Sequence, residues 1–215
     1  MKIKICGLRR IEDVDYVNRE HPDYIGFVFA GTKRKIDYET AVLLKKALDP
    51  AIQSVGVFVN EDISYIVRLV EENILDMVQL HGDETEEYIQ ALRFALRAKQ
   101  KAQVPIIKAV RVKSREQVLE AEQLPVDYLL LDAFIADEYG GSGKVFDHKL
   151  IPNLKKPYIL AGGIDSKNVI TILQSLSEEG KTPVCVDVSS SVETDGFKDE
   201  TKIKDMISVV RNCIW

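Results

Sequence analysis

The sequence predicts an α/β fold of the (β/α)8 barrel type, a TIM barrel, as a single domain over residues 1–215. Eight short runs of apolar, largely β-branched residues recur along the 215 residues, and their starts lie 22 to 30 residues apart. Polar stretches with helical spacing separate these runs, as in βαβ units around a parallel sheet. No GxGxxG pattern follows the first run, which disfavours an open, doubly wound sheet.

Each expected strand is a run of four to six residues. The runs are KIKIC from Lys2, YIGFVF from Tyr24, SVGVFV from Ser54, MVQL from Met77, IIKAV from Ile106, YLLL from Tyr128, YILA from Tyr158 and VCVDV from Val184. Eight strand–helix units in one chain make a closed barrel the economical interpretation.

The polar stretches between the strands predict helices with one apolar face. They cover residues 10–19, 38–47, 63–70, 84–102, 115–123, 166–176 and 199–210. Ser166 is the expected N-cap of the sixth of these helices. Residues 132–144 are glycine-rich and loop-like, and only a short helix at about 147–154 fits before Pro157.

The composition is that of an ordinary soluble globular protein, with 46% hydrophobic and 29% charged residues and a net charge of −5. The acidic balance and the lack of a basic block argue against nucleic acid as a partner. We find no run of about 18 apolar residues and no signal peptide, so we expect no membrane partner. Three cysteines without a CxxC pair fit a reducing compartment, and we expect a cytoplasmic protein.

Polar and glycine residues gather where the expected strands end, and in a barrel these ends surround the active site. Glycine or serine pairs follow the last two strands, and a glycine-rich loop follows the sixth. Backbone N–H groups in such loops approach phosphate oxygens closely. One glycine pair alone more often serves a tight turn, but three such loops at adjacent strand ends predict a phosphate site. Its candidate residues are Gly162, Gly163, Ser189 and Ser190, and the glycine-rich loop at 140–143 can supply further donors.

Two titratable residues at strand ends are candidates for a general base and a general acid. Cys6 could act as a thiolate, although its spacing alone more often indicates a small buried residue. Asp132 follows the apolar run LLL, and burial there would favour the protonated form that an acid needs. A salt-bridged or helix-capping carboxylate is the alternative for Asp132.

Two cations are further candidates. Arg34 lies in a basic loop after the second strand, where its guanidinium either binds a carboxylate or stays solvated. Lys108 on the fifth strand either forms the Schiff base of a barrel aldolase or pairs with Asp132 or Asp187. Of the three histidines only His81 lies at the expected rim, so we expect no metal site.

The segments at the expected rim together resemble those of the phosphoribosylanthranilate isomerase family. No single segment is decisive, but the set in this order is specific and covers nearly the whole chain. The matching segments are KICGL at 4–8, GFVF with KRKI at 26–36, VGVFVN at 55–60, VQLHGDE at 78–84, IKAV at 107–110, LLLDA at 129–133, YGGSGKVFD at 139–147, LAGGI with NV at 160–169, and VDVSSSVE with GFKD at 186–199.

The resemblance implies a role for each matching residue. Cys6 is the expected general base, Asp132 the expected general acid, and Arg34 the expected ligand of the anthranilate carboxylate. The loops after strands six to eight are expected to hold the substrate phosphate, around Gly141, Ser142, Gly162, Gly163, Ser189 and Ser190. We add His81 and Asp187 as expected substrate-binding residues at the same rim.

The family's reaction is an Amadori rearrangement in tryptophan biosynthesis, from N-(5′-phosphoribosyl)anthranilate to 1-(2-carboxyphenylamino)-1-deoxyribulose 5-phosphate. An acid protonates the ribose ring oxygen, and a base then removes the C2′ proton of the resulting Schiff base. The imine nitrogen of the substrate is the electron sink, so the resemblance implies no cofactor and no metal. The implied partner is a phosphorylated small molecule, bound by a monomer or a homodimer.

One departure from the family pattern affects the phosphate loop. Ser191 stands where the family usually has glycine, so we expect a tightened or reshaped loop there. Two alternatives stay open at this point. One is another phosphosugar barrel enzyme, an aldolase or an epimerase, and the other is a non-catalytic barrel that binds a phosphate ligand.

Overall fold

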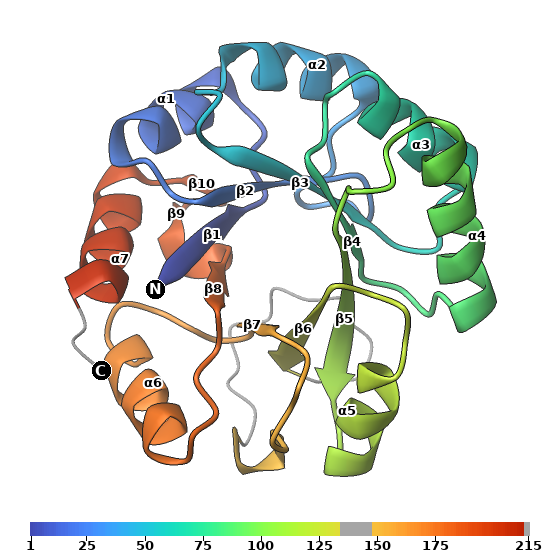
Figure 1. The fold of residues 1–215 in the computed structure, drawn as a ribbon. Coiled ribbons are helices and arrows are strands. Elements are labelled where there is room, and N and C mark those ends of the chain that lie inside the picture. Colours follow the sequence, from blue (N-terminus) through green and yellow to red (C-terminus); the bar gives the residue numbers. More distant parts are fainter. Residues whose placement is uncertain (134–147, 213–215) are drawn as a thin grey trace.

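A computed structural model describes residues 1–133 and 148–212, and its eight parallel strands close into a barrel (Figure 1). The strands are β1 (Lys2–Cys6), β2 (Tyr24–Val28), β3 (Gln53–Phe58), β4 (Met77–Leu80), β5 (Ile106–Val112), β6 (Tyr128–Ala133), β7 (Tyr158–Leu160) and β8 (Cys185–Val188). Each strand pairs with the next in the chain, and β8 pairs with β1. Every strand starts within one residue of its predicted position, so the predicted barrel is confirmed.

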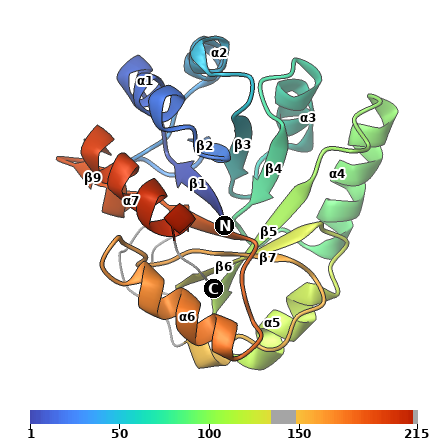
Figure 2. The same ribbon diagram turned by 60° about the vertical axis from the view of Figure 1, so that its left-hand side comes forward.

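The helices form a ring outside the barrel (Figures 1 and 2). They are α1 (Ile11–Glu20), α2 (Tyr38–Ala47), α3 (Ile63–Glu71), α4 (Glu86–Ala98), α5 (Arg115–Glu122), α6 (Val169–Glu178) and α7 (Glu200–Asn212). Each buries an apolar face, such as Val14 and Val17 of α1, in the core between helices and strands. Within the described ranges, no helix has the length and apolar character that crossing a membrane requires.

The helix expected at 84–102 is shorter at both ends in the structure. It begins at Glu86, after Thr85 accepts a hydrogen bond from the backbone N–H of Tyr88. Glu84 lies outside the helix because its carboxylate turns inward and pairs with Lys108. The helix ends at Ala98, and Gln100 follows in the left-handed region with φ 60°.

Two predictions between β6 and α6 are wrong. Ser166 is not an N-cap, because α6 begins only at Val169 and Asp165 accepts hydrogen bonds from the backbone N–H groups of Lys167 and Asn168. The short helix expected at about 147–154 is a single 3-10 turn, η1 (His148–Leu150). Pro152 explains its end, since proline disfavours helical backbone in the residue before it; residue 147 lies outside the described ranges.

The barrel interior is apolar at the end where the strands begin and polar toward the end where they finish. Tyr24, Met77, Ile107 and Cys185 belong to an apolar cluster that fills the end where the strands begin. Above it, Lys4 of β1 is fully buried and lies opposite Asp187 of β8 in the strand register. The charged groups inside the barrel therefore lie toward the carboxyl ends of the strands.

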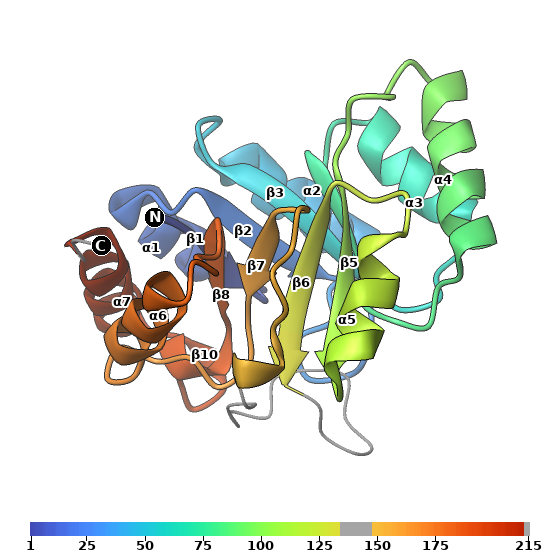
Figure 3. The ribbon, with the colours of Figure 1, turned by 60° about the horizontal axis from the view of Figure 1, so that its bottom comes forward.

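A small antiparallel hairpin follows β8, and the sequence analysis did not predict it. Its strands are β9 (Glu193–Thr194) and β10 (Phe197–Lys198), joined by Asp195 and Gly196. Both turn residues have positive φ, 51° and 78°, which is the geometry that Asp-Gly favours in a two-residue hairpin turn. Figure 3 shows β10 at the end of the barrel toward which the strand arrows point.

Candidate active site

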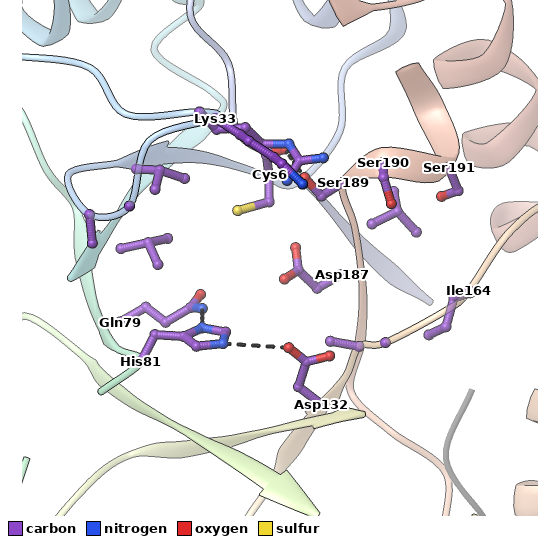
Figure 4. A pocket seen from close by; sticks show the side chains of 18 of the residues that line it. Cys6, Lys33, Gln79, His81, Asp132, Ile164, Asp187, Ser189, Ser190 and Ser191 are labelled. Atoms are coloured by element: carbon purple, nitrogen blue, oxygen red, sulfur yellow. Dashed lines mark hydrogen bonds and ion pairs between the residues drawn. The ribbon is translucent and has the colours of Figure 1, made fainter. Parts of the chain in front are cut away.

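A cavity of about 530 Å³ opens at the carboxyl ends of the strands. It is lined by every predicted site residue that the structure describes: Cys6, Arg34, His81, Asp132, Gly162, Gly163, Asp187, Ser189 and Ser190. Gly141 and Ser142 lie outside the described residues. Figure 4 shows Cys6 and Asp132 on opposite sides of this cavity, with the Asp187 carboxylate between them. The topology thus brings together residues that are far apart in the chain.

Cys6 ends β1 with its sulfur facing the cavity (Figure 4) and only 8% of its surface exposed. Gly26 on the neighbouring strand makes room for it, because a Cβ at Gly26 would lie 2.6 Å from the Cys6 Sγ. Burial and the Asp187 carboxylate raise the pKa of the Cys6 thiol, and together they outweigh Lys4 and Lys198, which lower it. The thiol is therefore the main form at neutral pH, and the two lysines stabilise its thiolate.

An ion pair lies beneath the cavity. The Nζ of Lys4 donates to Oδ1 of Asp187 at 3.0 Å. Burial lowers the pKa of Lys4, but the charges and hydrogen bonds of Asp187 and Cys6 together outweigh that effect and raise it. Burial likewise raises the pKa of Asp187, and Lys4 counteracts the shift. The charge of Lys4 favours the Cys6 thiolate, the charge of Asp187 opposes it, and the effect of Lys4 is the larger of the two.

Asp132 is the second-last residue of β6, has 5% of its surface exposed and faces His81, which follows β4. The His81 Nε2 lies 3.4 Å from Asp132 Oδ2, and its Nδ1 lies 2.9 Å from Nε2 of Gln79 (Figure 4). Because an amide nitrogen only donates, Nδ1 is the acceptor, and the neutral ring carries its hydrogen on Nε2. At 3.4 Å this nitrogen is within ion-pair distance of the Asp132 carboxylate but makes no hydrogen bond to the described residues.

Arg34 reaches the cavity from the loop between β2 and α2. Its side chain passes over Gly7, where a Cβ would lie 2.5 Å from the Arg34 Cδ. Its Nε and Nη2 donate to the two carboxylate oxygens of Glu193, each at 2.8 Å. This bidentate bond raises the pKa of Arg34, so the guanidinium is charged at every relevant pH.

The loops after β7 and β8 complete the wall of the cavity. Gly162 and Gly163 have positive φ values of 84° and 66°, which glycine adopts without strain. The hydroxyl of Ser189 donates to the Cys6 carbonyl at 2.9 Å, so the Ser189 side chain fixes the carboxyl end of β1. The buried Oγ of Ser191 has no hydrogen-bond partner among the described residues, and Ser191 does not have positive φ. Serine therefore fits at this position without backbone strain.

A comparison with protein families gives a match over residues 3–209 to the model described as N-(5′-phosphoribosyl)anthranilate (PRA) isomerase. A curated relative of that name from Endomicrobium trichonymphae is 47% identical over 211 residues, which is 98% of each chain. The chain belongs to the phosphoribosylanthranilate isomerase family. The resemblance seen in the sequence is thereby confirmed.

Solved structures of the family agree with the fold. The phosphoribosylanthranilate isomerase of Thermotoga maritima has a TM-score of 0.82 and 32% identity, with 98% of each chain covered. A second family structure, with a TM-score of 0.77 and 29% identity over 98% of each chain, is a complex with reduced 1-(o-carboxyphenylamino)-1-deoxyribulose 5-phosphate. Another Thermotoga maritima structure is of monomers generated from the dimeric enzyme.

Two sequence-based alternatives for Lys108 can be judged from its surroundings in this family member. Its Nζ donates to the Glu84 carboxylate and to the Gly82 carbonyl, both at 2.7 Å. The lysine is ion-paired, but its partner is Glu84 and not Asp132 or Asp187, because Glu84 lies before the helix instead of in it. Lys108 does not line the cavity, so its amine is not placed for a Schiff base there.

Several residues near the site were not predicted: Lys4, Gln79, Glu84, Glu193 and Lys198. Lys4 was detectable, since strand residues two apart face the same side and Lys4 stands two before Cys6. Glu193 and Lys198 flank an Asp-Gly turn, a hairpin signal that was overlooked. Within the described part of the chain, no group of three or more His, Cys, Asp or Glu side chains is arranged to hold a metal.

Proposed function

We propose that this chain catalyses the isomerisation of N-(5′-phosphoribosyl)anthranilate to 1-(2-carboxyphenylamino)-1-deoxyribulose 5-phosphate, a step of tryptophan biosynthesis. The observation that carries the proposal is the full-length family match on a barrel whose cavity holds a buried thiol and a buried carboxyl on opposite sides. An acid and a base on opposite sides of a sugar are what an Amadori rearrangement needs. The substrate is a phosphorylated small molecule.

Asp132 is the proposed general acid. Its proton goes to the ring oxygen of the ribose, the C1′–O bond breaks, and the nitrogen lone pair forms the C1′=N bond of a protonated Schiff base. Asp132 is then a carboxylate, and the Nε2–H of His81 at 3.4 Å stabilises the new negative charge. The position of His81 thus supports both its proposed contact with the bound substrate and the acid step.

Cys6 is the proposed general base. Its thiolate removes the C2′ proton, and the electron pair moves through C2′ and C1′ to the iminium nitrogen, giving an enolamine. Protonation at C1′ and loss of the hydroxyl proton at C2′ convert the enolamine to the ketone. The charges of Lys4 and Lys198 stabilise the thiolate form that this step requires.

The remaining site residues are proposed to hold the two anionic ends of the substrate. Arg34 binds the anthranilate carboxylate, because its charged guanidinium lines the cavity. Gly162, Gly163, Ser189 and Ser190, together with Gly141 and Ser142 of the loop after β6, bind the phosphate. Asp187 contacts the sugar from its place between acid and base. Binding at both ends holds C1′ and C2′ at the reacting groups.

The aldolase alternative has little support here, because the Lys108 amine lies outside the cavity and is ion-paired. We propose that the whole chain, residues 1–215, is one barrel domain that acts as a monomer or a homodimer without a cofactor, metal, nucleic acid or membrane. A cytoplasmic location follows from the proposed role of Cys6, since its thiol is free and buried and must stay reduced.

Turnover of freshly prepared N-(5′-phosphoribosyl)anthranilate tests this function. Loss of anthranilate-type fluorescence is followed with EDTA present. The proposal predicts loss well above the spontaneous background, unchanged by EDTA. Background rates from folded protein that still binds inorganic phosphate would contradict it and would point to another phosphosugar substrate.

A further inference from the structure

We propose that Glu193, anchored by the buried Lys198, positions Arg34 so that the free edge of its guanidinium meets the substrate carboxylate. This inference rests on the proposed function, in which Arg34 binds that carboxylate. It adds two residues from the hairpin β9–β10 to the machinery that selects a carboxylated substrate. Neither of them touches the reacting atoms, so both are positioning residues.

The geometry of the Arg34–Glu193 pair leaves half of the guanidinium free. Nε and Nη2 of Arg34 each donate to one oxygen of Glu193 at 2.8 Å, which occupies one edge of the planar group. The adjoining edge, formed by Nη1 and the second hydrogen of Nη2, is bonded to no other residue in the part of the chain that the structure describes. Because Arg34 lines the cavity, a bidentate bond to a ligand carboxylate is available on that edge.

Lys198 holds Glu193 from the other side. Its Nζ donates to Oε1 of Glu193 at 2.7 Å and to the carbonyl of Ser189 at 3.0 Å. Only 4% of Lys198 is exposed, and a lysine buried to that degree is costly unless it is paired. Both bonds keep Glu193 in place while Arg34 binds to it.

The charges in this cluster do not balance without a ligand. Arg34 and Lys198 carry two positive charges, and Glu193 carries one negative charge, so one positive charge is left in a largely buried site. A substrate carboxylate on the free edge of Arg34 would neutralise it. The arrangement therefore favours an anionic group at this end of the cavity.

The backbone around the cluster is fixed as well. Arg9 donates to the carbonyl of Lys33 at 2.7 Å and to the carbonyl of Gly196 at the hairpin turn, so it ties the loop of Arg34 to the hairpin. Arg9 and Arg10 also lie over the ring of Phe197, 4.8 and 4.2 Å from its centre. The loop of Arg34 and the hairpin that carries Glu193 are thus held next to each other by a third segment, which carries Arg9 and Arg10.

The test compares two ligands on four proteins. The ligands are the reduced form of 1-(2-carboxyphenylamino)-1-deoxyribulose 5-phosphate and the same molecule without its carboxyl group. The proteins are the wild type, Glu193→Gln, Arg34→Ala and the double variant. Although Glu193→Gln leaves the cluster more positive, we expect it to weaken binding of the carboxylated ligand about tenfold or more, because Arg34 loses its fixed orientation, and to leave the other ligand unaffected. In the Arg34→Ala background the same substitution should have no effect on the ratio of the two affinities.

Two further variants separate the proposed role of Glu193 from misfolding and from the general effect of losing an ion pair. Lys198→Met removes the anchor without touching Arg34 and should lower the affinity ratio in the same direction. Asp127→Asn breaks another Arg–Asp pair, with Arg93, away from the cavity and should change neither ligand's affinity. In turnover, Glu193→Gln should raise KM for the substrate more than it lowers kcat.

The possible failures are distinguishable. If wild type and Arg34→Ala show the same affinity ratio, Arg34 does not bind the carboxylate, and the proposed role and this inference both fail. If the ratio depends on Arg34 but not on Glu193 or Lys198, only this inference fails. Equal weakening of both ligands by Glu193→Gln would also overturn it, since that result indicates a purely structural role.

Discussion

At the scale of single residues, the position of the Cys6 sulfur depends on a neighbour that lacks a side chain. Gly26 on β2 leaves the space into which the Cys6 Sγ extends. We expect Gly26→Ala to push the sulfur aside and to lower kcat by about 10²-fold, the usual effect of displacing a reacting group by an ångström. The measurement is steady-state turnover together with the free energy of unfolding.

A matched glycine variant separates activity from stability. Gly180 lies after α6 with φ 68°, and a Cβ there would meet no atom within 4 Å. Gly180→Ala therefore costs about 1–2 kcal/mol of backbone strain without reaching the cavity. It should lose stability and keep the wild-type kcat, and an equal loss of kcat in both variants would contradict the role of Gly26.

The proposed base also predicts how its thiol titrates. Burial and the Asp187 carboxylate raise the pKa of the Cys6 thiol more than Lys4 and Lys198 lower it. The Cys6 thiolate should therefore form only above the ordinary pKa of a free thiol. The ultraviolet absorbance of thiolate, followed from neutral to alkaline pH in Cys185→Ala and in the double variant Cys6→Ala/Cys185→Ala, tests this, because the difference between the two curves belongs to Cys6. A difference that is already complete at neutral pH would contradict the raised pKa.

At the scale of elements, the sequence predicts strands better than helix ends or short hairpins. The eight strands are recognisable because buried parallel strands are unbroken apolar runs. Helix ends depend on single side chains. The inward turn of Glu84 depends on its tertiary contact with Lys108, and the turn before α6 depends on the local hydrogen bonds that Asp165 accepts from Lys167 and Asn168. The hairpin was missed because its strands have only two residues each, too few for any periodic pattern.

The hairpin should also contribute to stability in a pH-dependent way. Burial raises the pKa of Glu193, but its bonds to Arg34 and Lys198 outweigh that effect and lower the net value. A carboxyl with a depressed pKa stabilises the fold above its unfolded pKa and loses that contribution as pH falls through the folded pKa. The unfolding free energy of the wild type should therefore exceed that of Glu193→Gln at neutral pH, and the gap should shrink in acid.

Urea unfolding of both proteins across this range gives the comparison. Asp127→Asn again serves as the control, because it also removes one Arg–carboxylate pair but leaves the hairpin intact. A gap between wild type and Glu193→Gln that stays constant from neutral to acid pH would contradict the pairing of Glu193 in solution.

At the scale of the whole molecule, closure of the barrel is what turns separate motifs into a site. The rule that barrel sites form at the carboxyl ends of strands allows the sequence to predict the group that includes Cys6, His81 and Asp132. That rule identifies residues but not their partners. The contacts of Arg34 with Glu193 and of Lys108 with Glu84 join distant segments, and only the folded chain shows them.

Cys6 and Asp132 are the proposed base and acid of the isomerisation. The most direct test is kcat for Cys6→Ala and Asp132→Asn beside Cys185→Ala, whose thiol is buried in the same barrel but does not line the cavity. With all three folded, we predict losses of at least about 10²-fold for the first two and the wild-type kcat for the third. Turnover near the wild-type rate in Cys6→Ala or Asp132→Asn would contradict the account.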